Sequence, residues 1–281
     1  MSNGLAINIP TTFSRVLSDL SFIPDVKPDA LAYSGFYGGS LAESIVNSAK
    51  GATASQVSGE TIRNADRVSY GKGYLSVTGT GGDTSGGTGA RADVNLTSLD
   101  KNGFPGSLVT AFRNIKKVRE TSPAVRRLYP IASFYYNSTT SEGSPFLTIA
   151  AGIMDTGEKR IAAYSGSIAT LTTDALAFQC SVAIDWSAAD LISAGVSRAA
   201  DGTVTLLVNN GGQELSSVHK FPASVDDTNV TSSSILYGSM PKYTLDSGEI
   251  MVGQYWHNTA LTMSELQQQV ALIHLKANAR L

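Results

Sequence analysis

Short runs of strand-forming residues recur along almost the whole chain, and this recurrence is the feature that most limits its fold. Each run is apolar, or alternates apolar with polar residues, as β-strands do. Glycine, asparagine, aspartate or proline separates one run from the next, and these residues are typical of turns. The pattern predicts an all-β protein built as a two-sheet antiparallel sandwich. The runs occupy residues 31–33, 35–39, 68–70, 74–77, 107–115, 130–136, 146–153, 160–164, 175–185, 188–197 and 203–208.

Tight turns flank the clearest of these strands, at 203–208. Asp201-Gly202 precedes the strand, and 209–212 (Asn-Asn-Gly-Gly) follows it. Asp-Gly and Asn-Gly pairs supply the positive φ angles that short hairpin connections need. Both ends of this strand are therefore predicted to be hairpin turns.

One helix is predicted, over residues 262–275 near the end of the chain. Thr262 is suited to the N-cap, and Glu265 follows three residues later, as in a capping box. Leu266, Val270 and Ile273 fall on one face at helical spacing. We expect this face to pack against the body of the protein.

The last third of the chain resembles the concanavalin A-like lectin/glucanase family, in its laminin-G-like form. The residues that match are Asp201, Gly202, Val204, Leu206, Val208, Asn209, Gly238, Gly248, Ile250, Asn258, Ala260, Leu261 and Glu265, with a weaker match at Gly73, Tyr74, Leu75 and Val77. His257 departs from the pattern, because tyrosine is usual at its position. The resemblance implies a two-sheet antiparallel jelly-roll sandwich over residues 31–281. Its motifs are turn and packing residues, so they indicate architecture rather than activity.

Residues 1–30 are predicted to form an N-terminal arm. Three prolines surround one short amphipathic stretch at 13–20. Such an arm can dock on a neighbouring subunit or a larger assembly, or it can close one edge of its own domain. We expect the chain to form a homo-oligomer.

The charge balance argues against nucleic acid as a partner. The formal net charge is −2 and only 16% of the residues are charged, whereas phosphate binding needs a clear excess of lysine and arginine. The one basic stretch spans 113–127, with Arg113, Lys116, Lys117, Arg119, Arg126 and Arg127. We interpret it as a solvated loop or short helix, and docking on an acidic partner is the alternative.

The sequence carries no signature of a catalytic site, so we expect a non-catalytic protein. Glucanases that resemble this family place paired carboxylates on one strand, because acid and nucleophile act on the same bond from about 5 Å apart. No such strand is present, and the adjacent Asp226 and Asp227 would point to opposite faces. His219, His257 and His274 have no zinc-binding spacing. Calcium stays an alternative at Asp226, Asp227 and Asn229, although an exposed acidic turn explains this cluster as well.

If the chain binds a sugar, aromatic and amide side chains on loops are the expected contacts. Aromatic faces stack on sugar C–H surfaces, and amides hydrogen-bond to hydroxyl groups. The candidates are Tyr135, Tyr136, Asn137, Tyr243 and His257. Trp186 and Trp256 are predicted to lie in the core.

Composition favours a virion component made in a host cytoplasm. The only cysteine, Cys180, lies in an apolar run and is predicted to be buried, so no internal disulfide is expected. We recognise neither an export signal nor an apolar stretch of membrane-helix length. The low-charge, glycine-rich composition is typical of phage structural proteins. We therefore predict a non-catalytic virion-associated structural or attachment protein, such as a tail, fibre or decoration component, whose partners are other virion proteins or surface glycans. A free-standing carbohydrate-binding lectin module and a glycan-cleaving hydrolase are the alternatives.

Overall fold

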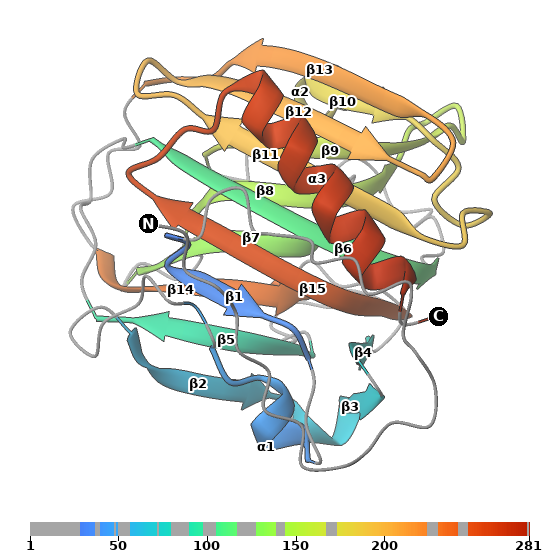
Figure 1. Ribbon diagram of the computed structural model, residues 1–281. Coiled ribbons are helices and arrows are strands. Elements are labelled where there is room, and N and C mark those ends of the chain that lie inside the picture. Colours follow the sequence, from blue (N-terminus) through green and yellow to red (C-terminus); the bar gives the residue numbers. More distant parts are fainter. Residues whose placement is uncertain are drawn as a thin grey trace, which may run out of the picture.

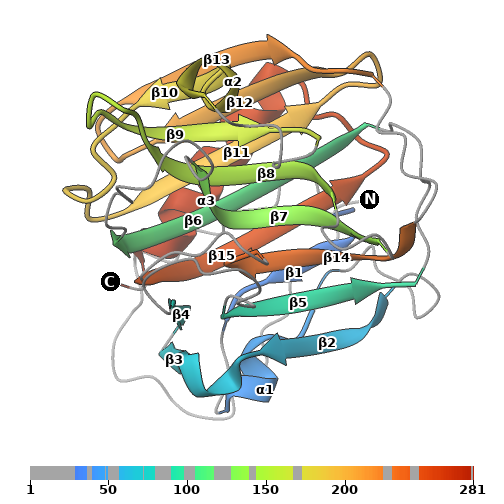
Figure 2. The same ribbon diagram turned by 180° about the vertical axis from the view of Figure 1, so that it is seen from behind.

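The structure is a computed structural model. It describes residues 29–36, 40–47, 49, 57–71, 73–79, 90–97, 105–116, 128–138, 144–166, 173–223, 230–240, 247–279 and 281. Within these ranges the strands form two sheets that lie face to face (Figures 1 and 2). All strand pairs are antiparallel. The predicted two-sheet antiparallel jelly-roll sandwich with a C-terminal helix is confirmed.

The larger sheet has eight strands in the described part of the chain. Its path is β13 (Glu214–Lys220), β12 (Thr203–Asn209), β11 (Ile192–Arg198), β6 (Gly106–Lys116), β15 (Ser247–His257), β4 (Tyr74–Thr78) and β3 (Val68–Gly71), and β1 (Ala32–Ser34) also pairs with β15. The second sheet has seven strands. Its order is β10 (Cys180–Ala183), β9 (Lys159–Tyr164), β8 (Ser144–Ile153), β7 (Leu128–Ser138), β14 (Val230–Gly238), β5 (Arg91–Leu96) and β2 (Val57–Arg63).

Aromatic side chains fill the space between the two sheets. Phe134 from β7 stacks on Tyr255 from β15, with ring centroids 4.9 Å apart. Tyr237 from β14 meets the edge of Phe36 at 5.4 Å and covers the backbone of Gly253. Because β14 and β15 belong to different sheets, these contacts join the two layers directly.

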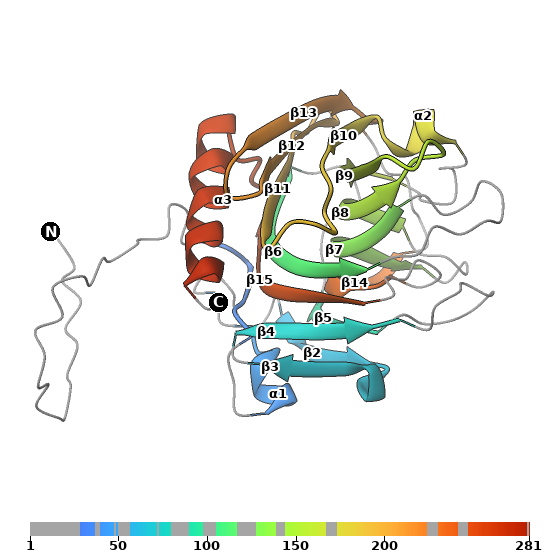
Figure 3. The ribbon, with the colours of Figure 1, turned by 90° about the vertical axis from the view of Figure 1, so that its right-hand side faces the viewer.

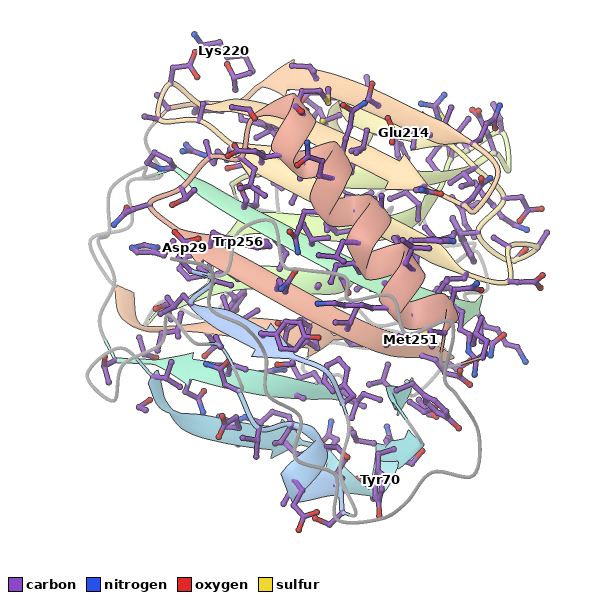
Figure 4. All side chains as sticks on the ribbon, in the orientation of Figure 1. Asp29, Tyr70, Glu214, Lys220, Met251 and Trp256 are labelled. Carbon is purple, nitrogen blue, oxygen red and sulfur yellow. The ribbon has the colours of Figure 1, made fainter. Side chains whose placement is uncertain are left out.

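The long helix α3 (Met263–Asn278) covers the outer face of the eight-stranded sheet (Figure 3). Thr262 and Glu265 form the predicted capping box. Leu266, Val270 and Ile273 are buried, as their spacing predicts. They belong to a second apolar cluster with β15 residues that include Met251 and Trp256 (Figure 4). The absence of a side chain at Gly195 in β11 allows α3 to lie this close, since a Cβ atom there would be 2.6 Å from Val270 Cγ2.

The predicted hairpin turns are confirmed. Gly202 and Gly211 have φ angles of 87° and 88°, which L-residues with side chains rarely adopt. The first turn links β11 to β12, and the second links β12 to β13. Gly202 also packs against the backbone of Phe221, so a side chain would not fit there.

Several predicted boundaries are wrong. Residues 175–177 belong to a short helix, α2 (Asp174–Ala177), because the Thr173 side chain caps its first turn, and β10 starts only at Cys180. The strand predicted over 188–197 begins at Ile192. Strands β2, β5 and β13 are missing from the predictions, and β14 and β15 coincide only with residues that carry the family resemblance. Gly35 and Phe36, predicted to begin a strand, do not belong to one. The remaining short helices are α1 (Leu41–Ser44) and the 3₁₀ helix η1 (Ala65–Arg67).

The first part of the basic stretch is neither a loop nor a helix. Arg113 to Lys116 are the last residues of β6, and Arg113 Nε pairs with Glu249 of β15 at 2.6 Å. This cross-strand ion pair accounts for Arg113 structurally. Residues 117–127 lie outside the described residues, as does the arm apart from Asp29 and the buried Ala30.

Candidate functional site

The seven-stranded sheet presents its outer face on the side of the molecule opposite to α3 (Figures 2 and 3). Side chains of β5 alternate across this sheet, as the pleat of a strand requires. Ala92, Val94 and Leu96 belong to the core cluster between the layers. Arg91, Asp93 and Asn95 therefore point to the outer face.

Six side chains of three neighbouring strands form one polar group on this outer face. We call it the polar cluster: Thr61 and Arg63 of β2, Arg91, Asp93 and Asn95 of β5, and Ser234 of β14. Strand register brings them together, because Thr61 is opposite Asp93, Arg63 is opposite Arg91, and Ser234 is opposite Asn95.

Hydrogen bonds connect the uncharged members of the polar cluster. The Asn95 amide donates to Thr61 Oγ1 at 2.7 Å, and Ser234 Oγ donates to Asn95 Oδ1 at 3.1 Å. Asn95 is thus held between both neighbouring strands. This arrangement fixes an amide and two hydroxyl groups on a rigid sheet.

The charged members share one carboxylate between two guanidinium groups. Asp93 Oδ1 accepts from Arg91 Nε at 2.8 Å, and Asp93 Oδ2 accepts from Arg63 Nε at 3.4 Å. Arg91 and Asp93 are buried, whereas 54% of the Arg63 side chain is exposed. Burial raises the pKa of Asp93, and the guanidinium groups of Arg91 and Arg63 oppose that rise. With both arginines charged and Asp93 ionised, the polar cluster carries one excess positive charge.

Tyr135 is the predicted site residue that lies nearest to the polar cluster in the sheet. It belongs to β7, directly opposite Ser234 of β14, so both share the outer face. Tyr135 is only 4% exposed, which leaves little ring surface for a sugar. Polar side chains are also present on β7 and the neighbouring strand β8, where Thr148 Oγ1 donates to Ser133 Oγ at 3.1 Å.

Three of the other predicted site residues lie wholly or partly outside the described part of the structure. Tyr136 and Asn137 also belong to β7, but their side chains lie outside what the structure describes, and so does the whole of Tyr243. His257 is at the end of β15 in the other sheet, with Nδ1 3.1 Å from the hydroxyl oxygen of Tyr255. The predicted calcium residues Asp226, Asp227 and Asn229 are outside the described residues as well.

None of the six residues of the polar cluster was predicted as a site residue from the sequence. The run 91–96 alternates charged or polar residues with apolar ones, which is a strand signal with one polar face. That signal could have revealed β5 and its outward side chains. It could not have shown that Thr61 and Ser234 lie beside them.

A shallow depression at the other end of the seven-stranded sheet is a weaker candidate. Glu158, Lys159 and Asp185 are among its lining residues. Lys159 Nζ donates to Asp185 at 2.8 Å and Ser187 Oγ donates to it at 2.7 Å, and these bonds lower the pKa of Asp185 to about 2. Lys159 and Asp185 are therefore paired with each other, and Glu158 is paired with Arg160.

The other side chains that could take part in catalysis or binding have structural roles instead. Trp186, Trp256 and Cys180 are buried, as predicted. His219 packs on the ring of Phe221. The described ranges contain no group of three His, Cys, Asp or Glu residues that could hold a metal ion, and none of their helices is long and apolar enough to cross a membrane.

Comparison with known proteins identifies the fold class but no family. No protein-family model and no curated protein sequence matches the chain. Among solved structures, Trypanosoma rangeli sialidase matches with a TM-score of 0.50 at 10% identity, over 91% of this chain and 33% of the sialidase. The botulinum neurotoxin type G receptor binding domain gives 0.49 at 12% identity, covering 86% of this chain and 51% of that domain. The Lotus tetragonolobus seed lectin gives 0.47 at 10% identity, covering 82% and 98%.

These matches bear on architecture alone. The chain spans about half the length of the neurotoxin binding domain and one third of the sialidase chain. Together with the two antiparallel sheets described above, the sialidase match places the chain in the class of lectin-like jelly rolls.

Proposed function

We propose that this chain is a non-catalytic attachment protein that binds glycans through the outer face of its seven-stranded sheet. The observation that carries this proposal is the polar cluster. It gathers hydroxyl, amide, guanidinium and carboxylate groups on one face, where they can donate to and accept from sugar hydroxyl groups. Their positions are set by strand register rather than by loops, and sites built on strands hold their geometry well.

The uncharged half of the polar cluster is suited to sugar hydroxyl groups. Asn95 and Ser234 are held by the hydrogen bonds described above, so a ligand does not have to order them on binding. Less side-chain entropy is then lost when the complex forms. Thr61 and Asn95 are only half-buried, which leaves them accessible to a ligand.

The charged half of the polar cluster does not favour hydrolysis. Retaining glycosidases need two carboxyl groups about 5 Å apart, and inverting enzymes need two at a larger separation. Asp93 is the single carboxylate of the polar cluster, and both of its oxygens accept from arginine. This arrangement supports binding over bond cleavage.

We further propose that the protein acts at the surface of a virion, as a homo-oligomer attached to other virion proteins. Support comes from composition: 27 glycines, one cysteine and 16% charged residues in 281. Mass spectrometry of purified particles, followed by antibody labelling, should find the chain on the particle. Its absence from particles, in cells where it is expressed, would remove this part of the proposal.

A glycan array and calorimetry test the binding function. The intact protein should bind a subset of the array, and Asn95→Ala should weaken that binding about tenfold, equal to about 1.4 kcal/mol. Thr61→Val should have a smaller effect in the same direction. Thr205→Val is the matched control, because Thr205 is a half-buried threonine in β12 of the other sheet.

Three outcomes would contradict the proposed function. Failure to bind any arrayed glycan would remove the lectin role. Unchanged affinity in Asn95→Ala would place the site elsewhere. Release of oligosaccharides from a bound polymer, measured by chromatography, would show that the chain is an enzyme.

A further inference from the structure

Arg91 holds a buried donor that nothing in the structure satisfies. Its Nη1 atom is enclosed and has no hydrogen-bond partner. The residue as a whole is 6% exposed. Arg91 donates from Nε to Asp93, so the donors on its Nη1 atom are not used by the protein.

An enclosed guanidinium with an unpaired nitrogen is costly. Leaving a buried donor unsatisfied costs about 1–3 kcal/mol, and more for a charged group. Buried polar atoms therefore almost always have partners, and each exception calls for an explanation. An oxygen atom supplied by a ligand would satisfy Nη1.

The charge balance of the polar cluster indicates what kind of oxygen this is. Arg63 and Arg91 are directly opposite each other on β2 and β5, and one carboxylate serves both. One positive charge is left over in a chain whose formal net charge is −2. A negatively charged ligand oxygen would balance it, whereas a sugar hydroxyl would not.

We infer that the glycan bound at the polar cluster carries a carboxylate, and that Arg63 and Arg91 bind this carboxylate together. This inference rests on the proposed function and names its ligand class: an acidic oligosaccharide containing a uronic or sialic acid. Guanidinium groups match a planar carboxylate through parallel hydrogen bonds, which lysine cannot reproduce. Asp93 is a positioning residue, since it holds the Nε side of both arginines and turns their remaining nitrogens toward the ligand.

The different exposure of the two arginines indicates the direction of entry. Arg63 lies on the edge strand β2 and its side chain is half-exposed. Its contact with Asp93, at 3.4 Å, is longer than the 2.8 Å contact made by Arg91. The ligand carboxylate therefore meets Arg63 first, because Arg63 is the more exposed of the two arginines. Thr61 and Asn95 then lie beside the sugar ring.

Matched pairs of ligands test this inference. Calorimetry should compare a panel of hexuronate and sialoside oligosaccharides with their carboxyl-reduced counterparts, which keep the same sugar backbone without the charge. At least one carboxylated member should bind more than tenfold more tightly than its reduced form. Its affinity should also fall as salt is increased, as expected for a partly exposed ion pair. Sulfated oligosaccharides of equal length serve as a second anion.

Variants of the two arginines should affect only the charged ligand. Arg63→Gln should weaken binding of the carboxylated form about tenfold and leave the reduced form unchanged. Arg91→Lys keeps the positive charge but loses the parallel N–H donors of the guanidinium group, so it should have the same selective effect. Arg67→Gln is the control, because Arg67 is a half-buried arginine of η1 outside the polar cluster. Circular dichroism should establish that each variant is folded, and Arg63→Gln at an exposed position provides a test even if Arg91→Lys unfolds.

The outcomes separate the inference from the function on which it rests. Equal binding of carboxylated and reduced forms would overturn the carboxylate assignment and leave glycan binding intact. Equal or tighter binding of the sulfated forms would replace the carboxylate by a general anion and overturn it as well. Failure of both forms and of every arrayed glycan would remove the proposed function itself.

Discussion

Replacing Gly253 with alanine tests how closely the two sheets are packed. Gly253 lies in β15 and faces the ring of Tyr237, which belongs to β14 of the other sheet. A methyl group on Gly253 would lie 2.6 Å from Cζ and 2.8 Å from Oη of Tyr237. Non-bonded carbon atoms are normally about 3.5–4.0 Å apart. Tyr237 Cε1 would be closer still, so the ring or one of the strands must move by about 1.5 Å or more.

Tyr237 has little freedom to make that movement. Its side chain is 1% exposed, and the ring of Phe36 meets it edge-on. Adding a methyl group to a close-packed core costs about 1–3 kcal/mol, occasionally more. Because the added atom meets the ring of an enclosed tyrosine, we expect the upper end, about 3 kcal/mol of unfolding free energy. For a chain of this size the loss lowers Tm by about 6–12 °C.

Thermal and urea unfolding, followed by circular dichroism, measure this loss. Gly212→Ala is the matched control, because the same methyl group at Gly212 would have no atom within 4 Å. Its unfolding free energy should stay within about 0.5 kcal/mol of the wild type. Tyr237→Leu, introduced together with Gly253→Ala, should recover part of the loss by making space. A Gly253→Ala protein with the Tm of the wild type would refute the packing described for the two layers.

Four further outcomes are expected, all at positions outside the polar cluster. Leu266→Ala should cost about 2–5 kcal/mol, because this side chain is fully buried between α3 and the sheet; a loss below 1 kcal/mol in urea unfolding would contradict that packing. Thr262→Ala removes the capping box and should cost about 1 kcal/mol in the same assay, and no loss would mean that the cap is not formed. Desolvation lowers the pKa of half-buried His274 from 6.5, so the unfolded chain binds a proton at this residue more readily than the folded protein does. Tm should therefore fall as the pH drops below 6.5, and it should fall less in His274→Gln. An equal fall in His274→Gln would contradict this role of His274. Burial raises the pKa of Cys180 to about 11, so iodoacetamide should modify this thiol only after the protein is denatured. Modification of the folded protein at pH 8 would show that the thiol is accessible and contradict this prediction.

The sequence predicted the elements whose signals lie close together in the chain. The capping box of Thr262 and Glu265 is complete within four residues, and Gly202 marks its own turn. The apolar face of α3 follows from helical spacing alone. By contrast, the apolar residues 175–177 were predicted to begin a strand. They are helical instead, because the Thr173 side chain accepts a hydrogen bond from the backbone of Leu176.

The residues of the polar cluster were not predicted from the sequence. Tyr135 was expected to contact a ligand, and it lies on the outer face that carries the polar cluster, although its ring is buried. Tyr136, Asn137, Tyr243 and His257 stay predictions of the sequence. Arg91 and Asp93 were overlooked, because two residues of opposite charge at alternating positions are common on any solvated strand.

The amino-acid sequence alone determined the class of architecture. It did so through strands of alternating polarity, hairpin turns at Asp-Gly and Asn-Gly, and a capped amphipathic helix. Each of these depends on interactions between residues a few positions apart. Only the tertiary structure decided which polar side chains meet. Ser234 and Asn95 are 139 residues apart in sequence and hydrogen-bonded in space, because β14 pairs with β5. That pairing depends on the packing of the whole sandwich, which no local pattern of residues records.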